Sequence, residues 1–211
     1  MTAGHKPPSR RTAELRRRQP LPPLPQRHRL PLDLAHRRRP LWVFGYGSLM
    51  WRPGFPVEAV LRARLSGWQR ALCVWSVHHR GRPGAEGLVL GLRPGGQCWG
   101  LAYKVPTEAR AAALAYLARR ELVTAVYLPR LVTVHTARGR VPALTFVADT
   151  AHLQFARHLG EEEAARVVAR ASGLSGHNRD YLETTVQRIA GLGFRDPALE
   201  RLMRRVAALD V

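Results

Sequence analysis

The chain has 211 residues, of which 45% are hydrophobic, and this size suits one domain with a full core and tails. No run of about 18 or more apolar residues is present, so we expect a protein that does not cross a membrane as a helix. The 34 Lys and Arg residues against 15 Asp and Glu give a net charge of +19, which alone is weak support for a nucleic-acid partner.

Much of the positive charge lies in residues 1–40. This segment has 11 Lys and Arg against 2 acidic residues, and it holds half of the 16 prolines. Such a composition buries too little apolar surface to offset the entropy of ordering. We therefore expect 1–40 to be a disordered basic extension and 41–211 to form the domain. An organellar transit peptide is the alternative for this acid-poor, Arg-rich segment, which lacks the apolar core of a secretory signal.

A short apolar run at 41–44 predicts a buried strand, and it is followed directly by a glycine-containing loop. We expect Gly45 and Gly47 to adopt backbone angles closed to other residues and to let main-chain N–H groups approach a ligand. Tyr46 and Ser48 supply hydroxyl groups at the same place. The loop is suited to hold a small anion such as a carboxylate. A tight turn without a ligand is the alternative.

The next elements are predicted to form a sheet of mostly sequential antiparallel strands. Residues 59–76 indicate either two strand pieces or one long bent strand, because Gly67 interrupts a β-forming run. Residues 86–92 and 97–105 are predicted as two strands, joined by a hairpin at 93–96.

An alanine-rich helix is predicted over 108–122, with Thr107 as its N-cap. At 100° per residue, Glu121 lies about 20° from Leu114 and about 40° from Leu117, on the apolar face. A carboxyl group directed at a core loses hydration, which raises its pKa and suits a general acid or base. The alternative is that Glu121 bends out to solvent or pairs with an arginine from another element.

Two arginines precede Glu121 in the same helix. Arg119 and Arg120 project about 200° and 100° away from Glu121 in the helical projection. We therefore expect neither of them to pair with Glu121 along the helix.

The remaining elements are two strands followed by a helical last third. We expect strands over 127–136 and 141–148 around a turn at 137–140, and helices over 161–171, over 180–189 and from Pro197 onwards. Asp196 is predicted as the N-cap of the last helix, with proline at its first position.

Cys73 and Cys98 lie in strand-like apolar runs without metal-ligand spacing. We interpret them as reduced core residues of a cytoplasmic protein, although the sequence leaves a disulfide open.

No cofactor is expected from the remaining motifs. His78 and His79 are adjacent, and His152 and His158 are six residues apart, which matches no recurring metal-ligand spacing. The glycine loop lacks the third glycine of a dinucleotide fingerprint and the Lys-Ser/Thr of a phosphate-binding loop. The sequence therefore predicts neither a metal nor a nucleotide cofactor.

Four segments, taken together and in order, resemble the ChaC-type gamma-glutamylcyclotransferases, and the resemblance runs from about residue 41 to the C-terminus. They are 43–51, 95–103, 119–121 with Tyr127, and 175–182. In two places the chain departs from the family pattern. Ala125 and Val126 stand where glycines are often found, and residues 1–40 have no counterpart.

The resemblance implies an α+β fold, a compact mixed β-barrel with flanking helices, and an enzyme that cleaves glutathione to 5-oxoproline and Cys-Gly without a cofactor. Glu121 matches the family's catalytic glutamate. The implied substrate-binding residues are Tyr46, Gly47, Ser48 and Leu49 in the loop that holds the glutamyl group, and Tyr127 and Tyr181 in the pocket.

Two alternatives follow from these observations. The same cyclisation could act on another γ-glutamyl compound, such as a γ-glutamyl amine or amino acid. A basic nucleic-acid-binding protein is the alternative of another class, but no aromatic platform is interleaved with its basic residues. We expect a small-molecule substrate, no nucleic acid and no membrane partner, and the oligomeric state stays open.

Overall fold

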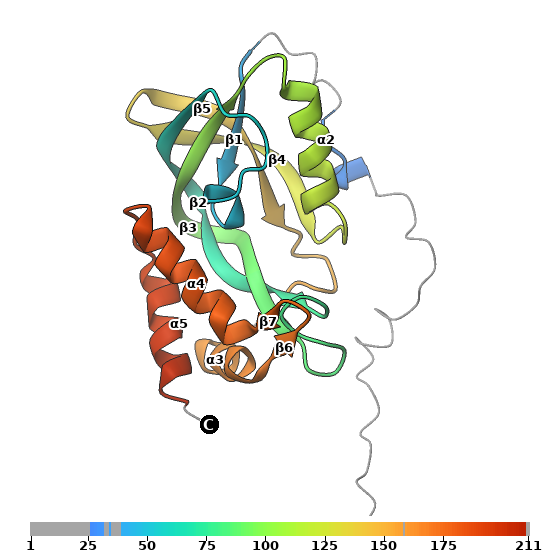
Figure 1. Ribbon diagram of the computed structural model, residues 1–211, viewed down its shortest axis with the longest axis vertical. Coiled ribbons are helices and arrows are strands. Elements are labelled where there is room, and N and C mark those ends of the chain that lie inside the picture. The colour runs from blue at the N-terminus through green and yellow to red at the C-terminus, as the bar shows by residue number, and fades with distance from the viewer. Residues whose placement is uncertain (1–25, 32–33, 35–38, 158, 210–211) are drawn as a thin grey trace, which may run out of the picture.

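The structure is a computed structural model that describes residues 26–31, 34, 39–157 and 159–209, and its centre is a closed five-stranded barrel. The barrel strands are β1 (Leu41–Gly45), β2 (Ala59–Ser76), β3 (Gly87–Val105), β4 (Tyr127–Thr136) and β5 (Gly139–Ala148). Their order around the barrel is β1-β3-β2-β4-β5, and a parallel contact between β5 and β1 closes it (Figure 1). The predicted mixed barrel is confirmed.

The prediction of mostly sequential strand pairing is wrong for β1. β2 pairs with β3 and β4 with β5, as sequential antiparallel neighbours. β1, however, lies between β3 and β5, with Leu41 opposite Val105 and Val43 opposite Leu144. Sequence periodicity reports which faces of a strand are buried but not which strands flank it. The neighbours of β1 are set by barrel closure.

The predicted hairpin at 93–96 is also wrong, because β3 runs through this segment as one strand of 19 residues. Gly95 and Gly96 have φ of +106° and +64°, and Gly67 on β2 has φ of +81°. Gly67 lies at a register shift in the β2–β3 pairing, at the level of the two β3 glycines. Left-handed glycines on both strands bend the paired ribbon instead of reversing the chain. One long bent strand over 59–76 is therefore confirmed.

Helix α2 (Arg110–Glu121) packs against the barrel through Leu114 and Leu117, which are buried as predicted. The predicted cap at Thr107 is wrong, since the helix begins three residues later with Ala109 at its N-cap position. A turn comes first, in which the Thr107 carbonyl accepts the N–H of Arg110 at 3.3 Å.

The last third of the chain is helical, as predicted. Helices α3 (Glu161–Arg170), α4 (Asn178–Gly191) and α5 (Pro197–Ala207) pack together beside one end of the barrel (Figure 1). A small hairpin of β6 (Ser172–Gly173) and β7 (Gly176–His177) joins α3 to α4. The Asp196 side chain accepts the N–H of Leu199 at 3.2 Å, which confirms the predicted N-cap.

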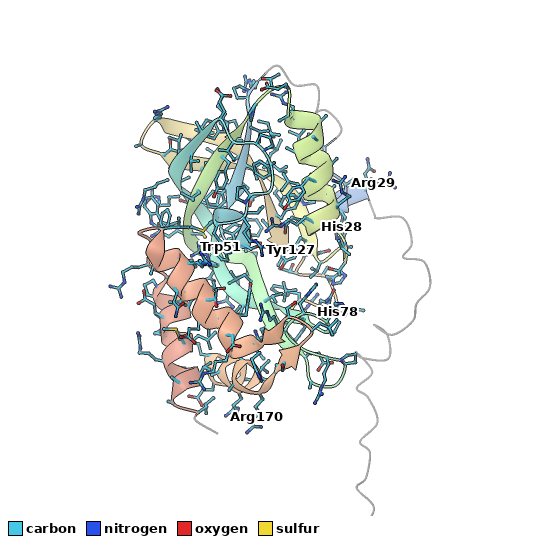
Figure 2. The ribbon with its side chains drawn as sticks, viewed as in Figure 1. His28, Arg29, Trp51, His78, Tyr127 and Arg170 are labelled. Atoms are coloured by element: carbon cyan, nitrogen blue, oxygen red, sulfur yellow. The ribbon has the colours of Figure 1, made fainter. Side chains whose placement is uncertain are left out.

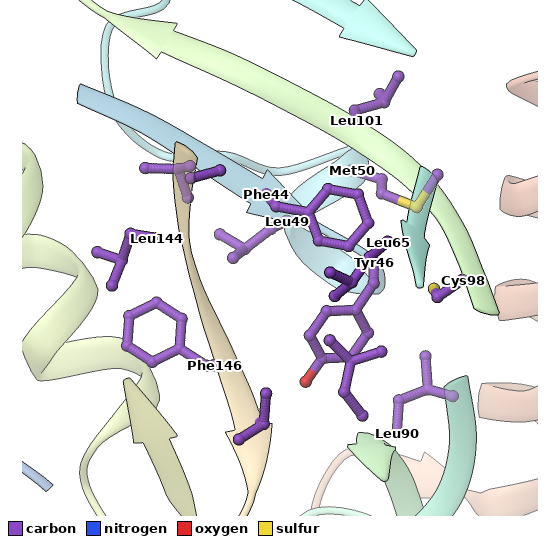
Figure 3. Packing of buried hydrophobic residues seen from close by; sticks show 14 of the residues in the cluster. Phe44, Tyr46, Leu49, Met50, Leu65, Leu90, Cys98, Leu101, Leu144 and Phe146 are labelled. Carbon is purple, nitrogen blue, oxygen red and sulfur yellow. The ribbon is translucent and has the colours of Figure 1, made fainter. Parts of the chain in front are cut away.

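One hydrophobic cluster fills the barrel and continues under the helices. Phe44, Leu144 and Phe146 are almost fully buried inside the barrel (Figure 3). Cys73 and Cys98 are free thiols in the interior, and burial raises their pKa values to about 12 and about 11. Their predicted place in the core is confirmed, and their reduced state stays a prediction.

In the part of the chain that the structure describes, no helix combines the length and apolar character needed to span a membrane.

Residues 1–25 lie outside the described residues, so the disordered extension stays a prediction for that segment. Within the predicted extension, however, residues Gln26–His28 form the short helix η1. His28 is buried, and its Nε2 lies 3.1 Å from a carboxylate oxygen of Asp149 at the end of β5 (Figure 2). Part of the basic segment is thus packed on the domain, through a contact 121 residues apart in sequence.

Candidate active site

The loop after β1 is held by close packing of its two glycines. It leads into a short 3-10 helix, η3 (Ser48–Met50). A Cβ on Gly45 would lie 3.0 Å from the Leu49 Cβ, and one on Gly47 would lie 3.2 Å from a methyl carbon of Leu90. Neither glycine has a positive φ, although Gly47 has φ of −133° and ψ of −131°, which lie outside the α and β regions. Close packing is a further reason for glycine at both positions.

Arg70 holds the glycine loop in place. Sequence reasoning did not select this residue. It lies on β2, is buried, and donates from Nε to the carbonyl of Tyr46. Its other nitrogens donate to the Trp99 carbonyl at 2.6 Å and to the Asp196 carboxylate at 2.7 Å. One guanidinium thereby joins the loop, β3 and the start of α5. The only sequence signal was an arginine in a strand-like run, which is ordinarily exposed.

All seven predicted site residues border a single pocket that encloses about 440 Å³, part of it open to solvent. They come from the loop, the end of α2, β4 and α4, and the barrel interior supplies the remaining wall. The lining residues are Tyr46, Gly47, Ser48, Leu49, Val89, Leu90, Glu121, Tyr127, Phe146 and Tyr181. The structure thus brings together residues up to 135 positions apart in sequence.

Glu121 is the acidic group of this pocket and the last residue of α2. Its side chain is 17% exposed, and burial raises its pKa above the ordinary value for glutamate. The Arg120 Nε lies 3.0 Å from a carboxylate oxygen of Glu121 and partly opposes this rise. The prediction that Arg120 would not pair with Glu121 is wrong, because a long side chain at the helix end is not confined to its Cα–Cβ direction.

Arg120 also connects the glycine loop to α2. Its guanidinium donates to the hydroxyl oxygens of Ser48 at 2.7 Å and Tyr116 at 2.8 Å, and to the carbonyl of Arg52 at 2.6 Å. The Ser48 hydroxyl oxygen accepts from Arg120, so its own proton remains available to a ligand. In the sequence, the position of Arg120 directly before Glu121 was the only indication that Arg120 belongs to the site.

Two tyrosines meet at one residue of β3. The Tyr127 hydroxyl donates to the Leu90 carbonyl at 2.6 Å, and the Leu90 N–H donates to the Tyr181 hydroxyl oxygen at 3.2 Å. Because the Tyr181 oxygen accepts this bond, its proton is available to a ligand.

Burial keeps the tyrosine hydroxyls of the pocket neutral. It raises the pKa values of Tyr46 and Tyr127 well above the usual 10, and it raises the pKa of Tyr181 as well. In Figure 3 the Tyr46 hydroxyl oxygen lies between Phe146 and Leu90, on the pocket side of the core. The pocket therefore combines neutral hydroxyl groups with one carboxyl group of raised pKa.

Ala125, which departs from the family pattern, has a left-handed backbone with φ of +55°. This conformation costs a non-glycine residue roughly 1–2 kcal/mol, which accounts physically for a glycine at such a position. Tyr127 still reaches the pocket two residues later.

Asn178, at the start of α4, sets the position of Tyr181. Its side-chain oxygen accepts the N–H of Leu88 at 2.6 Å, and its side-chain nitrogen donates to the Leu88 carbonyl at 2.8 Å. The residue is fully buried. Since Tyr181 follows by three positions, one turn of helix, this pair of bonds holds the tyrosine beside β3.

We expect Asn178→Ala to lower the free energy of unfolding by about 1–3 kcal/mol, because the buried backbone groups of Leu88 lose their partners. Denaturant titration measures this change. Asn178→Asp is the matched variant, because it keeps the acceptor and loses the donor. An unchanged midpoint for Asn178→Ala would contradict the structural role.

Among the described residues, no three His, Cys, Asp or Glu side chains are grouped as metal ligands. His158 lies outside those residues. The predicted absence of a metal therefore stays a prediction.

The barrel and its flanking helices have the fold of solved gamma-glutamyl cyclotransferases. A crystal structure of a yeast gamma-glutamyl cyclotransferase specific to glutathione aligns with a TM-score of 0.72 at 22% identity. The alignment covers 80% of this chain and 96% of the yeast chain.

Sequence comparison defines the family more narrowly. The model of the ChaC-like protein family matches residues 41–209, and the chain belongs to this family. It is 36% identical to the glutathione-specific gamma-glutamylcyclotransferase of Escherichia coli (strain K12), over 81% of this chain and 74% of the relative. It is 33% identical to gamma-glutamylcyclotransferase 2-3 of Arabidopsis thaliana, over 79% of this chain and 88% of the relative. The predicted family is confirmed.

Proposed function

We propose that the chain is a gamma-glutamylcyclotransferase that cleaves glutathione to 5-oxoproline and Cys-Gly, with Glu121 as general acid and base. The observation that carries this proposal is the placement of Glu121, with its raised pKa, beside the glycine loop in a single pocket. The Escherichia coli relative is named as glutathione-specific, which supports the same substrate. Both cysteines are free thiols, and we place the activity in the cytoplasm.

The reaction is an internal cyclisation. The α-amino nitrogen of the substrate forms a bond to its own γ-carbonyl carbon, and the bond from that carbon to the cysteine nitrogen breaks. At neutral pH the amine is an ammonium and cannot attack, so Glu121 accepts one of its protons. Glu121 then delivers this proton to the departing nitrogen. The attacking nitrogen loses a second proton as the lactam forms, and the amine of the released Cys-Gly takes up one, so two protons leave one nitrogen and two reach the other without any cofactor.

The other pocket groups hold the glutamyl part of the substrate. The free protons of Ser48 and Tyr181 are suited to donate to its α-carboxylate or to the oxyanion that develops on the γ-carbonyl. Neutral hydroxyl groups suit this role, since an ionised tyrosine would repel both negative charges. The fixed loop supplies orientation, because Arg70 and Arg120 hold its two ends.

We expect Arg120→Ala to move the acidic limb of the kcat/KM profile to higher pH. Glu121 acts first as a base, so activity falls as the pH falls through its pKa. Arg120 lowers that pKa in the folded protein, and its removal leaves the rise due to burial unopposed. The measurement is the pH dependence of 5-oxoproline release.

Arg119→Ala is the matched control, because Arg119 is the exposed neighbour in the same helix turn. Its acidic limb should coincide with that of the unmodified protein. If the acidic limb of the kcat/KM profile of Arg120→Ala stays at the same pH or moves to lower pH, Arg120 does not lower the pKa of Glu121 and is not a positioning residue.

The rival substrate class is another γ-glutamyl compound, and a panel separates it from glutathione. Glutathione, a γ-glutamyl amine and a γ-glutamyl amino acid are compared at equal concentration. We expect glutathione to give the highest kcat/KM. The proposed substrate is wrong if the γ-glutamyl amine is turned over more efficiently.

The nucleic-acid alternative is tested with a chain that lacks residues 1–25. The enzyme proposal predicts that the shortened chain retains turnover and that the full chain has no salt-dependent affinity for DNA or RNA. The alternative predicts such affinity in the full chain and its loss in the shortened one. This deletion keeps η1, whose His28 is packed on Asp149.

A further inference from the structure

A wide groove opens directly beside the γ-glutamyl pocket. The two share Ser48, Val89 and Tyr181 in their walls. The groove is much larger, with about 2210 Å³ of empty volume including its open mouth. Any substrate longer than a glutamyl group would pass these shared residues and enter the groove.

The groove is strongly basic. Four arginines line it against a single aspartate, Asp180. They are Arg52, Arg80, Arg120 and Arg188. Such a wall favours a ligand that carries negative charge, and a guanidinium matches a carboxylate with two parallel hydrogen bonds.

Arg80 lies next to the boundary between the pocket and the groove. Its Cζ is 5.2 Å from the ring centroid of Tyr181, which lines both spaces. One side-chain nitrogen donates to the carbonyl of His177 at 3.2 Å, which fixes the guanidinium. A guanidinium has five N–H donors, so most of its donors remain for a ligand. Arg80 forms no ion pair with any acidic side chain that the structure describes.

The other three arginines are placed less well for a ligand that leaves the pocket past Tyr181. Arg120 is engaged by Ser48 and Glu121. Arg188 is seven residues beyond Tyr181 on α4, which is about 10 Å along the helix axis. Arg52 is exposed and lies four residues after Ser48, on the segment that follows the loop.

We propose that this groove is the subsite for the leaving dipeptide and that Arg80 binds its terminal carboxylate. The inference rests on the proposed function. Two residues after the scissile bond span at most about 7 Å, and the Arg80 Cζ lies 5.2 Å from the ring centroid of Tyr181, a residue of the pocket wall. Arg80 thereby selects γ-glutamyl peptides with a free C-terminal carboxylate over γ-glutamyl amines.

The test compares glutathione with glutathione amide, in which the glycine carboxylate is replaced by a neutral amide. We expect the unmodified protein to prefer glutathione, and we expect Arg80→Gln to lower kcat/KM for glutathione about 10-fold or more, mainly through KM, because a charged hydrogen bond is lost. The amide should be turned over equally well by both proteins. Arg80→Lys keeps the charge and should keep a weaker preference for glutathione.

Arg82→Gln is the matched control, since Arg82 is exposed in the same loop but does not line the groove. It should leave both substrates unaffected. Equal losses of Arg80→Gln on glutathione and its amide would overturn the inference and leave the proposed function standing. Loss of the preference in Arg188→Gln instead would also overturn it. No 5-oxoproline from either compound would overturn the proposed function and this inference with it.

Discussion

Glu121→Gln is expected to lower kcat for 5-oxoproline release by roughly 10²–10⁴-fold, the usual contribution of a general acid or base. The amide keeps the size of the carboxyl group and its contact with Arg120, but it cannot accept the proton of the substrate ammonium. The effect should lie in kcat, since the groups that hold the glutamyl part are untouched. Glu108→Gln, at an exposed position just before α2, is the control and should be fully active.

The stability of Glu121→Gln separates a chemical effect from misfolding. The pKa of Glu121 is raised in the folded protein, so the folded state holds this proton more tightly than the unfolded chain. Stability is therefore lost as the pH rises from about 4.3 through the raised pKa. Glutamine does not titrate and therefore removes that loss. At neutral pH the free energy of unfolding of Glu121→Gln should be at least as large as that of the unmodified protein. Full turnover in a folded variant would show that Glu121 is not the acid and base.

Arg70→Ala is expected to lower the free energy of unfolding by about 3–5 kcal/mol, because it breaks a buried ion pair and leaves Asp196 and two carbonyl groups without their donor. The guanidinium is buried and donates to Tyr46, Trp99 and Asp196. Arg64→Ala on the same strand should change stability by less than about 0.5 kcal/mol. Denaturant titration of both variants measures the difference.

A double-mutant cycle with Asp196→Ala tests whether Arg70 acts through this pair. The two single losses should exceed the loss in the double variant, because each removes the same ion pair. Simple addition of the two losses would mean that Arg70 contributes through the carbonyl groups of Tyr46 and Trp99 and not through Asp196. In either case the loosened loop should raise KM for the substrate.

The local features of the site followed from the sequence. The 3.6-residue period placed Glu121 on the buried face of α2, and the apolar run before Gly45 placed the loop at the end of a buried strand. Asp196 before Pro197 identified the start of α5. Each of these depends on residues within about one or two turns, for which local physical chemistry is decisive.

The long-range features did not follow. Glycines at 95 and 96 are typical of a hairpin, and only the pairing with Gly67 on another strand shows that they bend a continuous ribbon. Arg70 and Arg120 have their roles through partners as far as 126 residues away, and no local pattern reports such contacts. Tyr127 and Tyr181 were found through the family resemblance, since periodicity does not indicate that both bind Leu90.

The most direct measurement is the product analysis of the purified chain with glutathione. The account predicts 5-oxoproline and Cys-Gly in equal amounts, with no free glutamate, because the attacking nitrogen belongs to the substrate. Release of glutamate in place of 5-oxoproline would mean that water attacks, and the absence of both products would mean that glutathione is not the substrate. Either result would contradict the account.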